Sequence, residues 1–207
     1  MSDEAIIRLN FGMRGSGKTA HIRQVIKSIN RLVIFDTLSK DYTDGVTFHN
    51  LIDLKKFWLK VYSGDFRMIY RPPVDDDESQ IIEDIAEICD LCMKCKNLTL
   101  VVEELNIIFD KQRPPKEFNK MIFGGREPGV ELFGAAQRPV GFGRKITSQA
   151  QEFCIFVNTE PDDLKYFKDY LGTDAAQAIR NLEKYQYLKW VYGDGARKWE
   201  ICKDELV

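Results

Sequence analysis

Apolar residues follow two patterns along this chain, and the two patterns alternate. Short continuous apolar runs, such as residues 98–104, are typical of strands that are buried on both faces of a sheet. Longer segments, such as residues 74–95, carry apolar residues at every third or fourth position, as amphipathic helices do. The predicted strands are residues 5–11, 31–36, 66–72, 98–104, 130–137 and 148–158, the last of which begins with a turn of helix. The predicted helices are residues 19–30, 51–64, 74–95 and 115–125.

This alternation predicts an α/β fold with a mostly parallel central sheet that is flanked by helices. Because the helix between the first two strands is short, these strands should be parallel and joined by a right-handed connection. The C-terminal part differs: residues 160–172 and 173–182 are predicted as two helices, the second capped by Thr173. Residues 185–202 are predicted as an antiparallel hairpin with a glycine-containing turn at 193–195, placed near an edge of the sheet.

The length of the chain favours one domain. Its 207 residues, 44% of them hydrophobic, can bury one sizeable core but do not suggest two full domains. We therefore predict a single domain over residues 1–207, in which residues 161–207 form C-terminal helices and a hairpin packed on a core of residues 1–160.

The charge and the apolar runs exclude two classes of protein. Thirty basic residues nearly balance 32 acidic ones, so the chain lacks the global basic field of a free-standing nucleic-acid binder. Any contact with nucleic acid must be local or built by assembly. No apolar stretch approaches the roughly 18 residues that indicate a membrane span. Five cysteines and a polar N-terminus favour a soluble protein in a reducing, intracellular setting.

Three of the cysteines raise the question of a metal site. Cys89, Cys92 and Cys95 are spaced by three residues within a predicted helix, where such positions drift across the surface and do not converge on one ion. No fourth Cys or His stands nearby in the sequence. We favour helix packing over metal binding for these thiols.

The clearest motif is the glycine-rich stretch GMRGSGKT, from Gly12 to Thr19. It fits the pattern G-x-x-x-x-G-K-[ST] and stands between a predicted strand and a predicted helix, which is the setting of a phosphate-binding loop. Glycines let backbone N–H groups turn toward phosphate oxygens, Lys18 offers a charge to the β- and γ-phosphates, and the Thr19 hydroxyl suits Mg²⁺. The alternative is a chance match in a glycine-rich turn. The residues predicted to hold ATP are Gly12, Arg14, Gly15, Ser16, Gly17, Lys18, Thr19 and Ala20.

A second motif is LTLVVEEL, in which a buried strand ends in Glu103 and Glu104. Carboxylates at the end of a strand beside a phosphate loop are what metal-assisted phosphoryl transfer needs. We predict that Glu103 holds Mg²⁺ and that Glu104 polarises the attacking water. The alternative is a solvated pair of glutamates at a strand end.

Two further residues are candidates for sensing or stabilising the γ-phosphate. Gln137 ends the following predicted strand, from which it could reach the γ-phosphate. Arg126 lies at the end of the preceding helix and could serve a neighbouring subunit as an arginine finger. The alternative for Gln137 is an ordinary polar residue, which is common at a strand end. The alternative for Arg126 is a surface arginine near a loop.

The motif order GMRGSGKT, LTLVVEEL and GREPGVELFGAAQRP resembles the HerA–FtsK superfamily of P-loop ATPases. It is most similar to the small genome-packaging ATPases of tailless viruses that have an internal membrane. The resemblance covers nearly the whole chain and implies a RecA-like P-loop NTPase core that assembles into a ring, usually a hexamer, around double-stranded DNA. It further implies that Glu104 is the catalytic carboxylate, Gln137 the sensor and Arg126 the finger that acts in trans. The chain departs from the family at Glu103, where Asp is more common.

A ring would also solve the charge problem, because loop residues would be repeated around a pore. The candidates for sequence-independent DNA contact are Lys111, Arg113, Arg144 and Lys145, with Lys116 and Arg138 in the same loops. For any one of them, a solvated loop charge is the alternative.

These observations lead to three hypotheses of function. The first is an Mg²⁺-dependent ATPase that moves double-stranded DNA, most simply a viral genome-packaging motor. Its expected partners are DNA, further copies of itself and a capsid or portal-vertex protein, in the host cytoplasm or at the virion vertex. The second is a morphogenesis or export ATPase similar to the Zot-like proteins of filamentous phages. The third, a P-loop kinase for a small metabolite, would need a lid with several arginines, for which residues 110–115 are a thin candidate.

Overall fold

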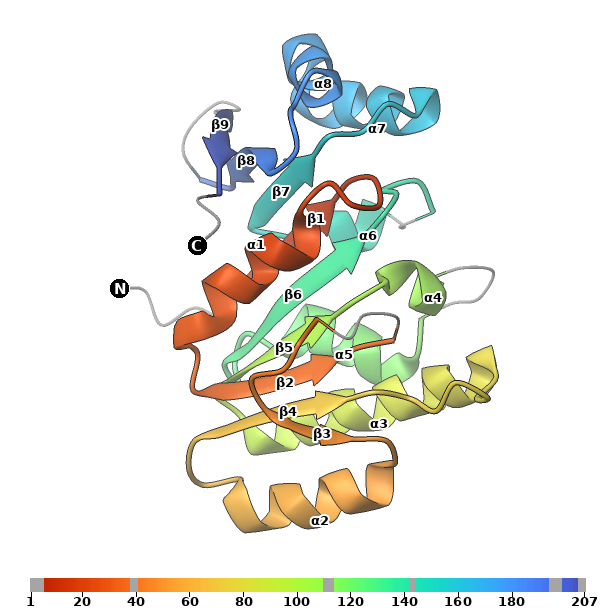
Figure 1. The fold of residues 1–207 in the computed structure, drawn as a ribbon, viewed down its shortest axis with the longest axis vertical. Coiled ribbons are helices and arrows are strands. Elements are labelled where there is room, and N and C mark those ends of the chain that lie inside the picture. The colour runs from red at the N-terminus through yellow and green to blue at the C-terminus, as the bar shows by residue number, and fades with distance from the viewer. Residues whose placement is uncertain (1–5, 38–40, 110–113, 142–143, 194–198, 205–207) are drawn as a thin grey trace.

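The chain is described by a computed structural model that covers residues 6–37, 41–109, 114–141, 144–193 and 199–204, without the side chains of Arg144 and Lys145. One sheet runs through the whole molecule (Figure 1) in the order β3-β4-β2-β5-β6-β1-β7-β8-β9. All pairs from β3 to β7 are parallel, and β8 and β9 continue the sheet in antiparallel fashion. The strands are β1 (Ile7–Phe11), β2 (Arg31–Phe35), β3 (Val46–Phe48), β4 (Phe66–Tyr70), β5 (Leu98–Val102), β6 (Val130–Ala136), β7 (Glu152–Phe156), β8 (Gln186–Val191) and β9 (Trp199–Lys203).

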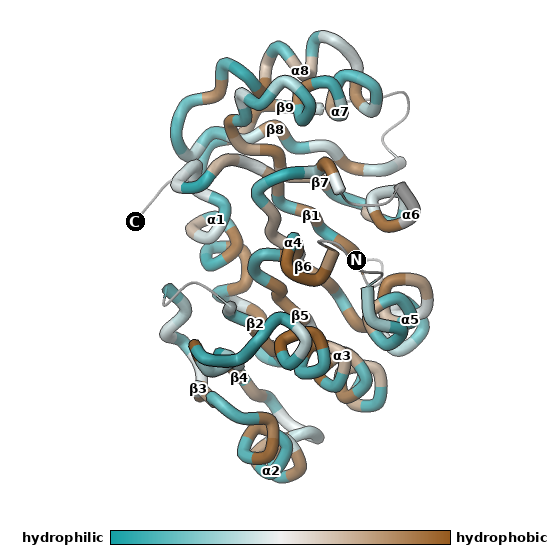
Figure 2. Tube along the Cα trace, turned by 90° about the vertical axis from the view of Figure 1, so that its right-hand side faces the viewer, coloured by the Kyte–Doolittle hydropathy of each residue, from teal (hydrophilic) through white to brown (hydrophobic). Residues whose placement is uncertain are grey.

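Helices cover both faces of this sheet, but unequally. On one face α1 buries Ile22 and Ile26 against the strands; on the other face α2, α3, α5, α7 and α8 enclose the larger core. Figure 2 shows α1 and α5 on opposite sides of the strands. The helices are α1 (Lys18–Val25, then a 3-10 turn Ile26–Ser28), α2 (Leu51–Val61), α3 (Glu78–Cys95), α4 (Leu105–Phe109), α5 (Lys116–Gly124), α6 (Arg144–Thr147), α7 (Pro161–Leu171) and α8 (Thr173–Arg180).

The central strands show why continuous apolar runs predicted them. In β2, Val33 and Phe35 point into the larger core, while Leu32 and Ile34 contact the α1 face. A strand with helices on both faces has no solvated side, so it has no alternating pattern. The mostly parallel sheet and the antiparallel hairpin at its edge are confirmed. The boundary at residue 160 stays a prediction, since β8 and β9 extend the same sheet.

Three short elements and one cap differ from the predictions. Strand β3 and helix α4 were not predicted, because three and five residues are too few to establish a period. The turn of helix predicted at the start of residues 148–158 is wrong, because the helical turn α6 ends at Thr147, before that segment. The prediction that Thr173 caps α8 is wrong: Gly172 holds the N-cap position with φ 104°, and Thr173 is the first helical residue. Glycine suits this position because its left-handed backbone carries no Cβ.

The three cysteines of α3 behave as packing residues. Cys89 and Cys92 are fully buried in the larger core. The Cys95 sulfur accepts hydrogen bonds from the Trp58 indole and the Arg31 guanidinium, each at 3.3 Å. Within the described ranges, no three His, Cys, Asp or Glu residues are grouped so as to hold a metal ion.

Candidate nucleotide-binding site

The loop of the first motif leaves the carboxyl end of β1 in the middle of the sheet and runs directly into α1. Gly12, Gly15 and Gly17 have φ of 151°, 76° and 118°, which L-residues with side chains rarely adopt. Two of these glycines also leave no room for a side chain. A Cβ on Gly12 would lie 2.7 Å from the Phe156 Cβ, and one on Gly17 would lie 2.8 Å from Tyr185 Cδ1.

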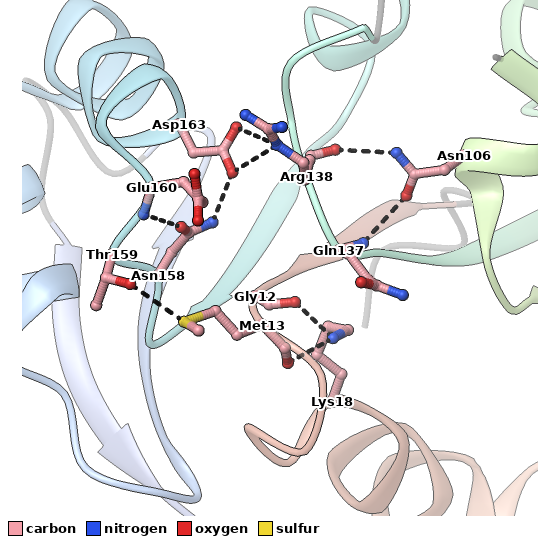
Figure 3. Close-up of polar contacts among 10 residues, drawn as sticks. All are labelled: Gly12, Met13, Lys18, Asn106, Gln137, Arg138, Asn158, Thr159, Glu160 and Asp163. Carbon is pink, nitrogen blue, oxygen red and sulfur yellow. Dashed lines mark hydrogen bonds and ion pairs between the residues drawn. The ribbon is translucent and has the colours of Figure 1, made fainter.

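The N-terminus of α1 has backbone N–H groups to offer an anion. Gly17, at the N-cap, has no side chain to occupy them, and the first turn holds no acidic residue. Lys18 curls back over the loop, and its ammonium donates to the carbonyls of Gly12 at 2.6 Å and Met13 at 3.0 Å (Figure 3). Burial lowers the Lys18 pKa, while the carboxylates of Glu104 and Glu103 act in the opposite direction. This end of the site therefore suits phosphate.

Glu103 follows β5 and is 5% exposed. Its Oε1 accepts a hydrogen bond from the Tyr42 hydroxyl. Burial raises the pKa of Glu103 to about 7, and the nearby carboxylates of Asp36 and Glu104 add to that rise. The Tyr42 hydrogen bond and Lys18 oppose it by stabilising the carboxylate. Glu103 is thus a buried acid that a nearby cation would stabilise in its ionised form.

Tyr42 is itself held by a partly buried ion pair. The Arg71 guanidinium donates to Asp36 at 2.8 Å and to the Tyr42 carbonyl at 2.6 Å. Asp36 follows β2 and Arg71 follows β4, so the ends of two neighbouring strands fix the tyrosine that contacts Glu103.

Glu104, one residue further on, has a different environment. Its backbone is left-handed, with φ 53°, and its side chain is partly exposed. The Gln137 side-chain amide donates to both oxygens of the carboxylate, at 3.2 and 3.4 Å. Asn106 fixes the segment that carries this glutamine: it accepts from the Gln137 backbone N–H at 3.1 Å and donates to the Arg138 carbonyl at 3.5 Å (Figure 3).

The phosphate loop and the acidic strand ends face one cavity of about 640 Å³, a size suited to a nucleotide. Its lining residues come from the phosphate loop, the acidic strand ends and the turn before β8. They are Arg14, Gly15, Gly17, Lys18, Thr19, Ala20, Asp41, Glu103, Glu104, Gln137, Lys184 and Tyr185. Gly12 and Ser16 belong to the phosphate loop but do not line the cavity. The buried Ser16 hydroxyl has no hydrogen-bond partner among the described residues.

The same cavity has donors that fit Mg²⁺. The Thr19 hydroxyl and the Glu103 carboxylate both line it. In nucleotide sites, Mg²⁺ takes one or two protein oxygens together with phosphate oxygens and water, so this set is sufficient.

The predicted arginine and lysine candidates lie elsewhere. Arg126 is exposed in the turn before β6, at the amino ends of the strands and hence at the opposite edge from the phosphate loop. Lys116 is exposed at the start of α5, and Arg144 and Lys145 open α6. Lys111 and Arg113 lie outside the described residues, as does most of the thin lid candidate.

Arg138 is paired within the chain. Its Nε donates to the Asp163 carboxylate at 3.2 Å, and Asp163 is fully buried at the start of α7 (Figure 3). The Asn158 amide donates to the same carboxylate at 3.1 Å. Arg138 therefore joins the segment of Gln137 to α7, and its charge is partly neutralised for any contact with DNA.

Sequence reasoning missed three residues that line the cavity, Asp41, Lys184 and Tyr185. It also missed Tyr42 and Asn106, which bond to Glu103 and to the backbone of Gln137. They stand in short irregular segments without a motif. The position of Asp36 at the end of an apolar run was a signal for a polar strand end, but nothing in the sequence paired it with Arg71.

No helix in the described part of the chain is both long and apolar enough to cross a membrane.

Comparison with known proteins identifies the fold. No protein-family model matches the chain, and no curated protein sequence matches it. Among solved structures, the genome packaging NTPase B204 from Sulfolobus turreted icosahedral virus 2, in complex with AMPPCP, has a TM-score of 0.76 at 21% identity over 99% of both chains. B204, the DNA-packaging ATPase from Sulfolobus turreted icosahedral virus, has a TM-score of 0.71 at 20% identity, covering 99% of this chain and 98% of that one.

A third structure is less similar. The N-terminal domain of zonular occludens toxin from Neisseria meningitidis has a TM-score of 0.54 at 13% identity, covering 99% of this chain and 95% of that one. The chain therefore has the α/β P-loop NTPase fold of the packaging NTPases, which confirms the predicted fold.

Proposed function

We propose that this protein is an Mg²⁺-dependent ATPase that assembles into a ring and moves double-stranded DNA, as a viral genome-packaging motor. The observation that carries the proposal is a phosphate loop that faces the Glu104–Gln137 pair across one cavity. The similarity in fold to NTPases described as packaging genomes or DNA supports DNA movement as the use of the hydrolysed ATP.

In the proposed reaction, the loop N–H groups and Lys18 hold the β- and γ-phosphates. Thr19 and Glu103 would hold Mg²⁺, which would stabilise the charge on the phosphate oxygens. Glu104 accepts a proton from the attacking water, whose oxygen bonds to the γ-phosphorus as the bond to the β,γ-bridging oxygen breaks, giving ADP and phosphate. Gln137, which donates to Glu104, orients that carboxylate and reports the γ-phosphate.

The partners belong to the same proposal. DNA contact through Lys111, Arg113, Arg144 and Lys145 would gain strength by repetition in a hexameric ring, and Arg126 would reach the cavity of the neighbouring subunit from its exposed turn. A capsid or portal-vertex protein would anchor the ring, in the host cytoplasm or at the virion vertex.

The first experiment is the steady-state ATPase rate of the purified protein, with and without double-stranded DNA, over a range of protein concentrations. Stimulation by DNA and a steep rise of specific activity with concentration are expected. Activity that is proportional to protein and indifferent to DNA would overturn the motor. Mixing Arg126→Ala with Glu104→Gln subunits tests the shared site: partial recovery of activity is expected, and none at any ratio rules out a trans finger.

A second candidate function is a morphogenesis or export ATPase, which the similarity in fold to the zonular occludens toxin domain favours. ATP hydrolysis without any response to DNA is its expected signature.

A further inference from the structure

The nucleotide cavity is chemically different on the two sides of the phosphate loop, and this fixes the direction of a bound nucleotide. Glu103, Glu104 and Gln137 form one end, where hydrolysis requires the γ-phosphate. The triphosphate then passes over Lys18, so the nucleoside must leave toward the other end. Lys184 and Tyr185 line the cavity from the turn before β8, and in the sheet β8 lies on the other side of β1 from β5 and β6.

Tyr185 is fixed against the phosphate loop by bonds on both sides of its backbone. Its N–H donates to the Ser16 carbonyl at 3.1 Å, and its carbonyl accepts from the Asp204 N–H at 3.1 Å. Its backbone is left-handed, with φ 67°. The Asp204 carboxylate in turn lies 3.0 Å from Nδ1 of His21 on α1. Residues near both ends of the chain therefore hold the Tyr185 ring beside the phosphate loop.

The Tyr185 ring is half-buried, and a flexible charge lies over it. The Lys184 ammonium is 4.8 Å from the ring centroid, and the Lys184 side chain is exposed. An exposed ammonium leaves an aromatic face at small cost, because such contacts are weak in water. Once displaced, it remains beside the cavity, where phosphate is the natural partner for its charge.

We propose that Tyr185 and Lys184 form the nucleoside subsite of this cavity, with the Tyr185 ring stacking on the purine base and Lys184 moving from the ring to the α-phosphate. The proposal rests on the proposed function, since it specifies how the same site recognises ATP. Stacking recognises the flat face that every base has, so the subsite favours large purines over pyrimidines without reading hydrogen-bond patterns. Tyr185 is then the residue that distinguishes a nucleotide from a bare triphosphate.

The test compares the binding of ATP and of inorganic tripolyphosphate by calorimetry. Tyr185→Leu should weaken ATP binding about tenfold or more, because base stacking is lost, and should change tripolyphosphate binding by less than about twofold. Tyr185→Phe should bind ATP as the wild type does. Tyr192→Leu is the matched control, since Tyr192 is a 73% exposed tyrosine of the same hairpin, and should change neither affinity.

Each other result has a defined meaning. If Tyr185→Leu weakens both ligands equally, Tyr185 supports the loop and the subsite is wrong; if it weakens neither, the base binds elsewhere. A wild type that binds neither ligand overturns the proposed function and the subsite together. A second measurement does not depend on the leucine variant. Tyr185→Trp should show a fluorescence change with ATP and none with tripolyphosphate, after subtraction of the wild-type signal, and no difference between the two ligands would overturn the proposal.

Discussion

The phosphate loop and the acidic end of the cavity face each other but are built in opposite ways. The loop is one contiguous stretch, Gly12 to Thr19, shaped by the backbone of its glycines. The acidic end is assembled from side chains that follow four different strands, β2, β4, β5 and β6. The loop depends on local conformation, whereas the acidic end depends on the order of strands and on hydrogen bonds between side chains. We therefore expect nucleotide binding and hydrolysis to separate under mutation.

The largest effect is expected from the loop. Lys18→Met removes the buried charge that lies over the glycines, so ATP affinity and turnover should fall together, with kcat/KM reduced by about 100-fold or more. Calorimetry and steady-state kinetics measure the two effects. Lys27→Met, at an exposed site after α1, is the control and should change little. A variant that keeps wild-type affinity would show that the Lys18 charge is not used for phosphate.

Glu104→Gln should impair hydrolysis at the acidic end while leaving nucleotide binding by the phosphate loop intact. Loss of the proton acceptor should lower kcat by about 10²–10⁴-fold, while ATP affinity stays within a few-fold. Single-turnover hydrolysis together with nucleotide binding measures the split. Glu127→Gln, in the exposed turn before β6, controls for loss of negative charge. Equal loss of binding and hydrolysis would contradict the separation of the two ends.

Tyr42→Phe tests whether side-chain bonds define the acidic end. The change leaves a buried Glu103 oxygen without its donor, which should cost about 1–3 kcal/mol of unfolding free energy. More Mg²⁺ should be needed for half-maximal activity, while ATP binding in EDTA should stay unchanged. Urea unfolding and Mg²⁺ titration measure these two effects, with the exposed Tyr62→Phe as control. An unchanged Mg²⁺ requirement would limit Tyr42 to a structural role.

The last prediction concerns pH and the free energy of unfolding in EDTA without nucleotide. The pKa of Glu103 is about 7 in the folded protein, above its ordinary value of 4.5, so the folded state holds the proton more tightly. Its contribution to stability is therefore full below about pH 4.5 and lost as the pH rises to about 7, a loss of about 3 kcal/mol. Glu103→Gln should lack this part of the decline in urea unfolding between pH 5 and 8. Parallel pH curves for the two proteins would refute the raised pKa.

The difference between the two regions also explains what the sequence could predict. The loop motif, the strand before it and the helix after it are contiguous, so pattern and chemistry agreed at Gly12 to Thr19. Glu103, Glu104 and Gln137 were found because each follows an apolar run, and the parallel sheet brings such ends to one edge. Their roles remain predictions, as does that of Arg126.

What escaped prediction depends on strand order and on irregular backbone. Tyr42 reaches Glu103 because β2 lies beside β5, and no periodicity in the chain encodes that neighbour. Tyr185 is placed by two backbone hydrogen bonds to distant residues, which leave no pattern in the side chains. Thr173 was misassigned because a threonine before an apolar segment suits a cap, but the preceding glycine occupies that position.

The position of β1 has a consequence for how the protein is made. β1 precedes all the other described strands in the chain, yet its partners are β6 and β7, which end at Ala136 and Phe156. Contacts between residues so distant in sequence form late, because the intervening chain must first be closed into a loop. The nascent chain therefore exposes its phosphate loop before β6 and β7 are available to pair with β1. Ribosome-stalled chains that end before β7 should fail to retain ATP, and should be cleaved near β1 by protease, until that strand has emerged.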